Sequence, residues 1–243
     1  MKITNTYILV CIAACAISMP ALSQDAYDEI IVTGSRLSGY DSEAVPVVHI
    51  KRRPDFMVVD AYIESDSRVA ATRTKEINKT LESLARRAAS TPNITLGLSR
   101  SFETDDDEIE YVVDFDRDDV EIVSGRRPDT SRVALVVKSP VLEGDSSPDV
   151  VHARIESFLK SIDVSGRAVV KDFGEINYSL IGISQYREPL LKMLAQDIQK
   201  LRALFGEDYN VTIIGLEYPV RWRVSGAMQL AIYFPYGSSL TSD

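Results

Sequence analysis

FMVVDAYIES, residues 56–65, is the stretch of this 243-residue chain from which the fold can be worked out. Apolar and polar side chains alternate along it, so that one face would carry Met57, Val59, Ala61 and Ile63 and the other Asp60, Tyr62 and Glu64. A period of two residues places alternate side chains on opposite faces of an extended backbone. We therefore predict a half-buried β-strand over Phe56–Ser65.

The chain after this strand changes to a helical period. Between residues 69 and 89 apolar side chains, among them Ile77 and Leu81, recur every three or four positions, with charged residues between them. This spacing predicts an amphipathic helix. We expect Ser67 to be its N-cap and Pro92 to prevent its continuation.

Two more helices are predicted further along the chain. One begins at Ser147-Pro148, because a cap residue followed by proline suits the first helical turn, and is expected to end at Gly166. The other covers Leu190–Phe205, where leucines form one broad apolar face. Gly206 stands where the C-terminal cap of that helix belongs.

Short β-prone segments fill the rest of the domain. They cover residues 47–51, 94–102, 109–115, 133–137, 168–173, 177–183, 210–217 and 221–234. Several of them follow one another directly and must pair as antiparallel hairpins. The sequence therefore predicts an α+β fold, with mixed, mostly antiparallel sheets packed against about three amphipathic helices, rather than a doubly wound parallel sheet.

The N-terminus has the three parts of a secretory signal peptide. Lys2 supplies the positive charge, residues 7–17 form an apolar run, and Ala21-Leu22-Ser23 has small residues at the two positions that a signal peptidase reads. We expect residues 1–23 to be removed and the mature chain to lie in the periplasm. The apolar run is shorter than the roughly 20 residues that span a bilayer, and no later stretch is long and apolar enough to be a transmembrane segment.

Both cysteines, Cys11 and Cys15, lie in this signal peptide. The mature chain would therefore have neither a disulfide nor thiol chemistry. An alternative is that residues 12–15 form a lipoprotein cleavage site, which would leave a lipid anchor on Cys15.

The rest of the chain divides into three parts. Residues 24–46 contain several Gly, Ser and Asp and no helical period, and are expected to form a flexible N-terminal arm. Residues 47–236 would form one α+β domain, and residues 237–243 a C-terminal tail.

The formal net charge of −9 argues against nucleic acid as a partner, because phosphate binding needs concentrated Lys and Arg.

The most specific short motif lies in the arm. Residues 28–36, DEIIVTGSR, are similar to the TonB box that opens mature TonB-dependent outer-membrane transporters. A β-prone segment on a flexible arm suits that role, because it can add as a strand to the sheet of a partner. The alternative is that the segment is an ordered N-terminal strand. The expected partner-binding residues are Glu29, Ile30, Ile31, Val32 and Thr33.

The order of elements resembles that of the SIMPL-domain proteins, a family also catalogued as a domain of unknown function. The resemblance rests on the strand at 47–51, the pair Pro54-Asp55, and the alternating strand followed by a long helix with Ala70-Ala71 near its start. It covers residues 47–236 and implies a SIMPL-like fold in a non-enzymatic envelope protein, sometimes a homo-oligomeric ring and sometimes linked to envelope maintenance or stress. The acidic insertion at 104–121 and the leucine-rich last helix depart from the family pattern.

No group of residues in the sequence amounts to an active site. His49 and His152 do not form a pair at metal-ligand spacing, and no serine lies in a nucleophile elbow. Asp114, Asp116 and Asp118 alternate as in a calcium loop, but its glycine and closing glutamate are missing. We therefore expect no catalysis, no cofactor and no metal, and a protein that acts by binding or assembly. The alternative function is an accessory role in TonB-dependent uptake.

Overall fold

The computed structural model describes residues 29–32, 45–103, 108–206 and 209–242. The predicted signal peptide, residues 1–23, and most of the predicted arm, residues 24–46, lie outside the described residues. Within the described ranges, none of the helices has the length and apolar character needed to cross a membrane.

The described part of the chain contains three α-helices and twelve strands. The helices are α1 (Ala70–Ser90), α2 (Pro148–Lys160) and α3 (Arg187–Phe205), and the 3₁₀ turn η3 (Ile183–Tyr186) precedes α3. The strands are β1 (Glu29–Val32), β2 (His49–Arg52), β3 (Phe56–Ser65), β4 (Thr95–Glu103), β5 (Glu108–Asp114), β6 (Val123–Ser124), β7 (Ser131–Pro140), β8 (Ala168–Ile181), β9 (Tyr209–Ile214), β10 (Arg221–Gly226), β11 (Gln229–Tyr233) and β12 (Gly237–Ser242).

Six of the strands form a closed barrel. Their order is β3-β8-β1-β5-β4-β7, and β7 pairs with β3 again. The pairings among the described strands are antiparallel. The α+β prediction, with largely antiparallel sheets and three helices, is confirmed. Closure of the sheet was not predicted, because it depends on pairing between strands that are far apart in the sequence.

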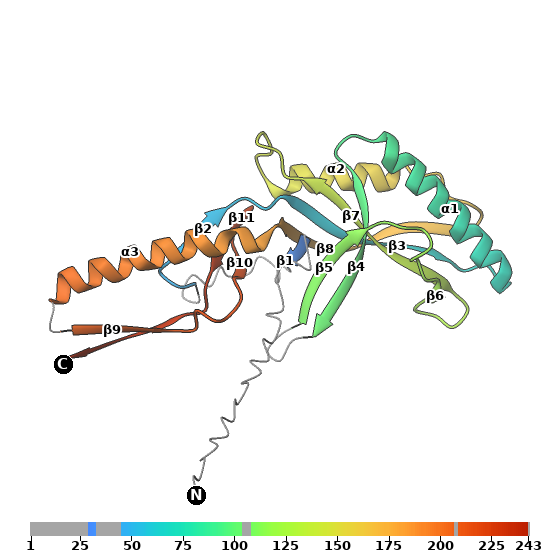
Figure 1. Ribbon diagram of the computed structural model, residues 1–243. Coiled ribbons are helices and arrows are strands. Elements are labelled where there is room, and N and C mark those ends of the chain that lie inside the picture. Colours follow the sequence, from blue (N-terminus) through green and yellow to red (C-terminus); the bar gives the residue numbers. More distant parts are fainter. Residues whose placement is uncertain (1–28, 33–44, 104–107, 207–208, 243) are drawn as a thin grey trace, which may run out of the picture.

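Strand β3 has the predicted bounds and lies between β7 and β8 in the barrel. It pairs with β7 along its whole length, from Phe56 to Ser65, and with β8 on its other edge. The predicted apolar face, Met57, Val59, Ala61 and Ile63, is completely buried. This face belongs to the main core together with apolar residues of α1 and α2, which lie over β3, β7 and β8 (Figure 1).

The opposite face of these strands forms a second, smaller core. Its buried members are Ile31, Val58, Val112 and Val136, with Phe56 packed against them. Because the helices cover the other face, this one is turned toward the inside of the closed ring. The inner space of a six-stranded ring is narrow, and small residues such as Gly97 fit it.

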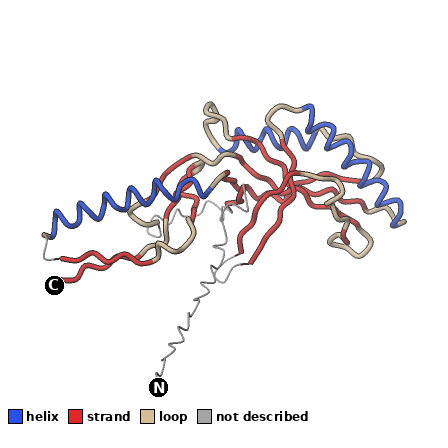
Figure 2. Tube along the Cα trace, viewed as in Figure 1, coloured by secondary structure: helices blue, strands red, loops and turns tan. Residues whose placement is uncertain are grey.

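The remaining elements extend the molecule on one side of the barrel. Strands β10, β11 and β2 form a three-stranded sheet, and Leu230, Ile232 and Phe234 join the main core. Helix α3 and the two-stranded ribbon of β9 and β12 lie side by side and point away from the barrel (Figures 1 and 2). We call α3, β9 and β12 the C-terminal projection.

The structure differs from the sequence predictions at several boundaries. Helix α2 ends at Lys160 rather than Gly166, because Ser161 closes it with a hydrogen bond from its hydroxyl to the carbonyl of Phe158 at 2.7 Å. The strands predicted at 168–173 and 177–183 are one strand, β8, with a register shift between them.

Two further differences lie near the C-terminus. The strand predicted at 221–234 is two strands, β10 and β11, because the chain reverses between Gly226 and Gln229. Most of the predicted tail, residues 237–243, forms strand β12. It is ordered because it pairs with every residue of β9.

Helix α1 does not use the predicted N-cap. The N-cap residue is Val69, and the hydroxyl of Ser67 donates instead to the carboxylate of Glu76 at 2.8 Å. Ser65 donates to the same carboxylate at 2.6 Å. These hydrogen bonds, that of Ser65 first, lower the pKa of Glu76.

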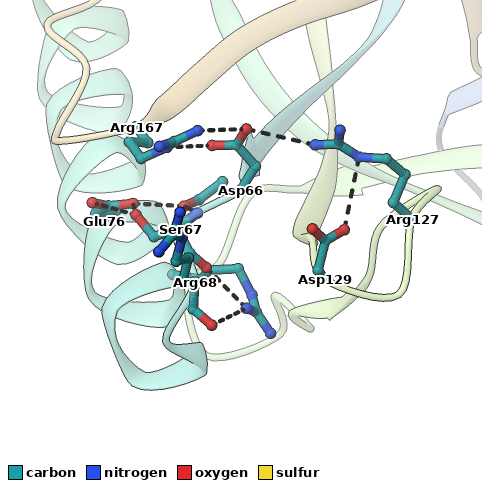
Figure 3. Close-up of polar contacts among 9 residues, drawn as sticks. Asp66, Ser67, Arg68, Glu76, Arg127, Asp129 and Arg167 are labelled. Atoms are coloured by element: carbon teal, nitrogen blue, oxygen red, sulfur yellow. Dashed lines mark hydrogen bonds and ion pairs between the residues drawn. The ribbon is translucent and has the colours of Figure 1, made fainter.

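A cluster of ion pairs surrounds this turn (Figure 3). Arg167 donates two hydrogen bonds to Asp66, at 2.7 and 3.0 Å, and Arg127 lies 3.5 Å from the same carboxylate. The hydrogen bonds from Arg167 lower the pKa of Asp66. Because these carboxylates and guanidinium groups pair with one another, the cluster joins three loops at one end of the barrel.

Gly97 provides a test of the closed ring. A Cβ at this position would lie 2.5 Å from Cγ1 of Val112 and 2.9 Å from the carbonyl oxygen of Val113, on the neighbouring strand. We expect Gly97→Ala to lower the free energy of unfolding by about 1–3 kcal/mol, the usual cost of overpacking. Urea denaturation measures it. The matched control is Gly144→Ala, where no atom lies within 4 Å of the added Cβ. Equal unfolding midpoints for the two variants would contradict the structure of the ring.

Candidate interaction site

Residues 29–32 of the segment similar to a TonB box form strand β1 of the barrel. Its residues pair with β8 from Glu29, opposite Ile181, to Val32, opposite Tyr178. On the other edge Ile30 pairs with Tyr111 of β5. Two isoleucines and a valine in succession have high β-propensity, which explains why this segment is extended. Strand β1 therefore completes the ring between β8 and β5.

The side chains of β1 point alternately to the two cores. Ile30 is 3% exposed and belongs to the main core. Ile31 is 4% exposed and belongs to the inner core, beside Val58 and Val136. A solvent-exposed arm would bury neither side chain, so the hydrophobic effect favours β1 in this position by several kcal/mol, at about 1.5–3 kcal/mol for each side chain.

Glu29 of β1 forms a buried ion pair with Lys138. Its carboxylate accepts a hydrogen bond from the ammonium group of Lys138 on β7 and another from the hydroxyl of Ser179 on β8. The side chains of Lys138 and Glu29 are only 6% and 11% exposed. The ammonium group of Lys138 also lies 5.0 Å from the centre of the Phe56 ring. The start of β1 is thus fixed to strands β3, β7 and β8.

These positions bear on the predicted partner-binding residues. Glu29, Ile30, Ile31 and Val32 lie in a strand that is paired on both edges, and Thr33 lies outside the described residues. Residues 29–32 have the conformation of the alternative prediction, an ordered N-terminal strand. Binding to a partner sheet would require β1 to leave the barrel. The TonB contact stays a prediction.

The C-terminal projection is a second candidate site, which the sequence did not indicate. Helix α3 has a broad apolar stripe, as predicted, but only Leu190 and Leu194 of its residues are buried. Toward its end Leu204 is 79% exposed and Phe205 51% exposed. On the ribbon Ile214 is 68% exposed. The ribbon contacts α3, with the rings of Phe205 and Tyr209 6.1 Å apart, but it leaves these apolar side chains largely exposed.

The acidic residues singled out in the sequence do not gather. The described residues contain one group of three potential metal ligands, and Asp114, Asp116 and Asp118 are not in it. The Asp116 carboxylate instead accepts a hydrogen bond from the backbone N–H of Asp118 at 2.9 Å, which is a local turn interaction.

Searches against protein-family models, curated proteins and solved structures give no match to this chain.

The Glu29–Lys138 pair gives a test of where β1 lies. We expect Lys138→Met to lower the free energy of unfolding by about 3–5 kcal/mol, because it leaves the charge of Glu29 buried without a partner. The matched control is Lys192→Met, since Lys192 and its partner Glu188 are 71% and 76% exposed. That control should change stability by less than about 0.5 kcal/mol. Chemical denaturation of both variants measures this, and similar small losses in the two would show that β1 is not held in the barrel.

Proposed function

We propose that this chain is an exported, non-enzymatic binding and assembly protein of the cell envelope, and that it assembles with further copies of itself through the C-terminal projection. The observation that carries the proposal is the set of exposed apolar side chains on this projection, with Leu204 and Phe205 at the end of α3 and Ile214 at the end of β9. Exposed apolar side chains that gather on one part of a folded protein, unlike ones scattered singly, mark an interaction site.

The projection is poorly stabilised within one chain. A helix in water depends mainly on packing of its apolar face, and α3 buries two of its 19 residues. The ribbon that covers it has two strands, and an isolated two-stranded ribbon is marginally stable. Burial of Leu204, Phe205 and Ile214 against another chain would supply the missing stabilisation.

A second copy of the chain fits this surface for a geometric reason. Among the described residues β9 and β12 form a sheet of two strands, so each has an outer edge to which no further described strand is added. Two identical strand edges related by a two-fold axis pair as antiparallel strands without any requirement on sequence. Self-association through the ribbon would therefore satisfy the backbone groups and cover the apolar side chains together.

The cellular setting follows from the sequence. The signal peptide predicted at residues 1–23 supports export to the periplasm, and the order of elements over residues 47–236 supports a SIMPL-like fold. That resemblance links the proposed assembly to envelope maintenance or stress.

The projection can be tested with charged substitutions. One full-length copy of the chain has a mass of 27.0 kDa, and removal of the predicted signal peptide would lower it. We expect light scattering after gel filtration to give at least twice the mass of one such mature copy for the unmodified chain. Leu204→Asp combined with Ile214→Asp should give a monomer, because two charges cannot be buried without partners.

The control for this experiment uses exposed apolar residues elsewhere. Val150 and Val164 are 44% and 51% exposed and lie outside the projection. Val150→Asp combined with Val164→Asp should leave the oligomer intact. A monomeric unmodified chain, or equal dissociation by both double variants, would overturn the proposal.

An accessory role in TonB-dependent uptake is the second candidate function, and the short seam between β1 and β5 favours it. Among the described residues, a single residue of β1, Ile30, pairs with β5, whereas all four residues of β1 pair with β8. The β5 edge of β1 is thus the weaker one, and it could open to let a partner strand pair with β1.

A disulfide that locks β1 in place tests this alternative. Ile31 and Ser179 are direct antiparallel partners, at a separation that suits a disulfide. In a chain with Cys11 and Cys15 replaced, Ile31→Cys with Ser179→Cys should bind the periplasmic domain of TonB when reduced and lose binding when oxidised. A pull-down measures this. Equal binding in both states, or none in either, would exclude release of β1 as the mechanism.

A further inference from the structure

The described residues bring together one group of side chains with the chemistry of a metal site. His152 and Glu156 lie one turn apart on α2, and Asp172 lies on β8, against which α2 packs. One potential ligand atom from each residue lies within 4.8 Å of those of the other two. His152 has no second histidine at metal-ligand spacing, and Asp172 lies on a different element, so the group was not predicted from the sequence.

A buried nitrogen gives an independent reason to look for a ligand here. Nε2 of His152 is buried and has no hydrogen-bond partner among the described residues. A buried polar atom without a partner costs about 1–3 kcal/mol, so such atoms are rare in native structures. A metal ion bound at Nε2 would remove that cost, because a neutral imidazole offers one nitrogen lone pair for coordination.

The hydrogen bonds found among the described residues use one oxygen of each carboxylate. The Oδ1 atom of Asp172 accepts the backbone N–H of Gly174 at 3.1 Å, which orients the group. The Oε2 atom of Glu156 accepts a hydrogen bond from Lys160 at 2.8 Å. This hydrogen bond is the main reason that the pKa of Glu156 is lowered, so the carboxylate is charged at neutral pH.

The two carboxylates are accessible from solvent, whereas Nε2 of His152 lies beneath them in the protein. Glu156, Asp172 and Lys160 line the same surface pocket, together with Leu159, Val170 and Lys171. Ligand atoms around a tetrahedral zinc ion lie about 3.4 Å apart, given bonds of about 2.0–2.2 Å. Zinc binding would therefore require the three ligand atoms, which lie within 4.8 Å of one another, to approach that separation, and the partly exposed side chains of Glu156 and Asp172 have room to move.

We propose that His152, Glu156 and Asp172 bind a divalent transition-metal ion of the zinc class. One imidazole and two carboxylates suit zinc, whereas magnesium and calcium prefer sites made of oxygen atoms alone. Three protein ligands leave a fourth position for water or for a group from a partner. Lys160 competes with the metal for Glu156.

The experiment is a titration of the untagged, ¹⁵N-labelled full chain with zinc chloride, followed by NMR of the imidazole groups. The chain has two histidines, so the signals of His152 and His49 can be told apart. We expect zinc to shift the signals of His152 and leave those of His49 unchanged, with no effect of magnesium at the same concentration. Absence of zinc binding, or a shift confined to His49, would overturn the proposal.

Variants assign the ligands through calorimetric measurement of zinc affinity. His152→Gln, Glu156→Gln and Asp172→Asn should each weaken binding by at least about tenfold, since even residues behind the ligands contribute that much. Asp149→Asn, an exposed carboxylate on the same helix, is the matched control and should have little effect. Lys160→Met should strengthen binding, a gain that a folding defect cannot produce. Unchanged affinity in the three ligand variants, or weaker binding in Lys160→Met, would contradict the assignment.

Discussion

Strand β3 is paired along its whole length to β7 on one edge and, apart from one register shift, to β8 on the other, and the rest of the structure depends on this arrangement. With both edges paired and Met57, Val58 and Val59 all fully buried, β3 has no free side. The strand order runs from β3 through β8, β1, β5 and β4 to β7, so the pairing of β7 with β3 closes the sheet into a ring. Helices α1 and α2 cover its outer face, and β1 enters where the ring between β8 and β5 would otherwise remain open.

Local sequence patterns were sufficient to predict most helices and strands but not the closure of the sheet into a barrel. The alternation in residues 56–65 predicted both bounds of β3, and the cap and proline at Ser147-Pro148 predicted the start of α2. The N-cap at Ser67 was wrong because its hydroxyl is bound to Glu76, a contact that depends on the fold of the loop. Pairing of β3 with β7, and the place of β1, are long-range features that periodicity does not contain.

The candidate sites, too, depend partly on local sequence patterns and partly on long-range contacts. The apolar stripe of α3 was visible in the sequence, but its exposure depends on how little of the chain folds over it. Residues 28–36 were interpreted, from the similarity of the motif to a TonB box, as a binding segment or alternatively as an ordered N-terminal strand. The part that forms β1 buries Ile30 and Ile31 in two different cores, which the motif does not indicate. His152, Glu156 and Asp172 come together only because α2 packs against β8. Binding surfaces and ligand groups in this chain are thus products of its tertiary structure.

Assembly through the C-terminal projection is the central claim, and hydrogen exchange tests it most directly. Amide exchange of β9, β12 and the last two turns of α3 should be compared at high and low protein concentration. The account predicts slow exchange at high concentration and faster exchange after dilution in these elements, with no change in β3. Exchange in the projection that does not depend on concentration would contradict it.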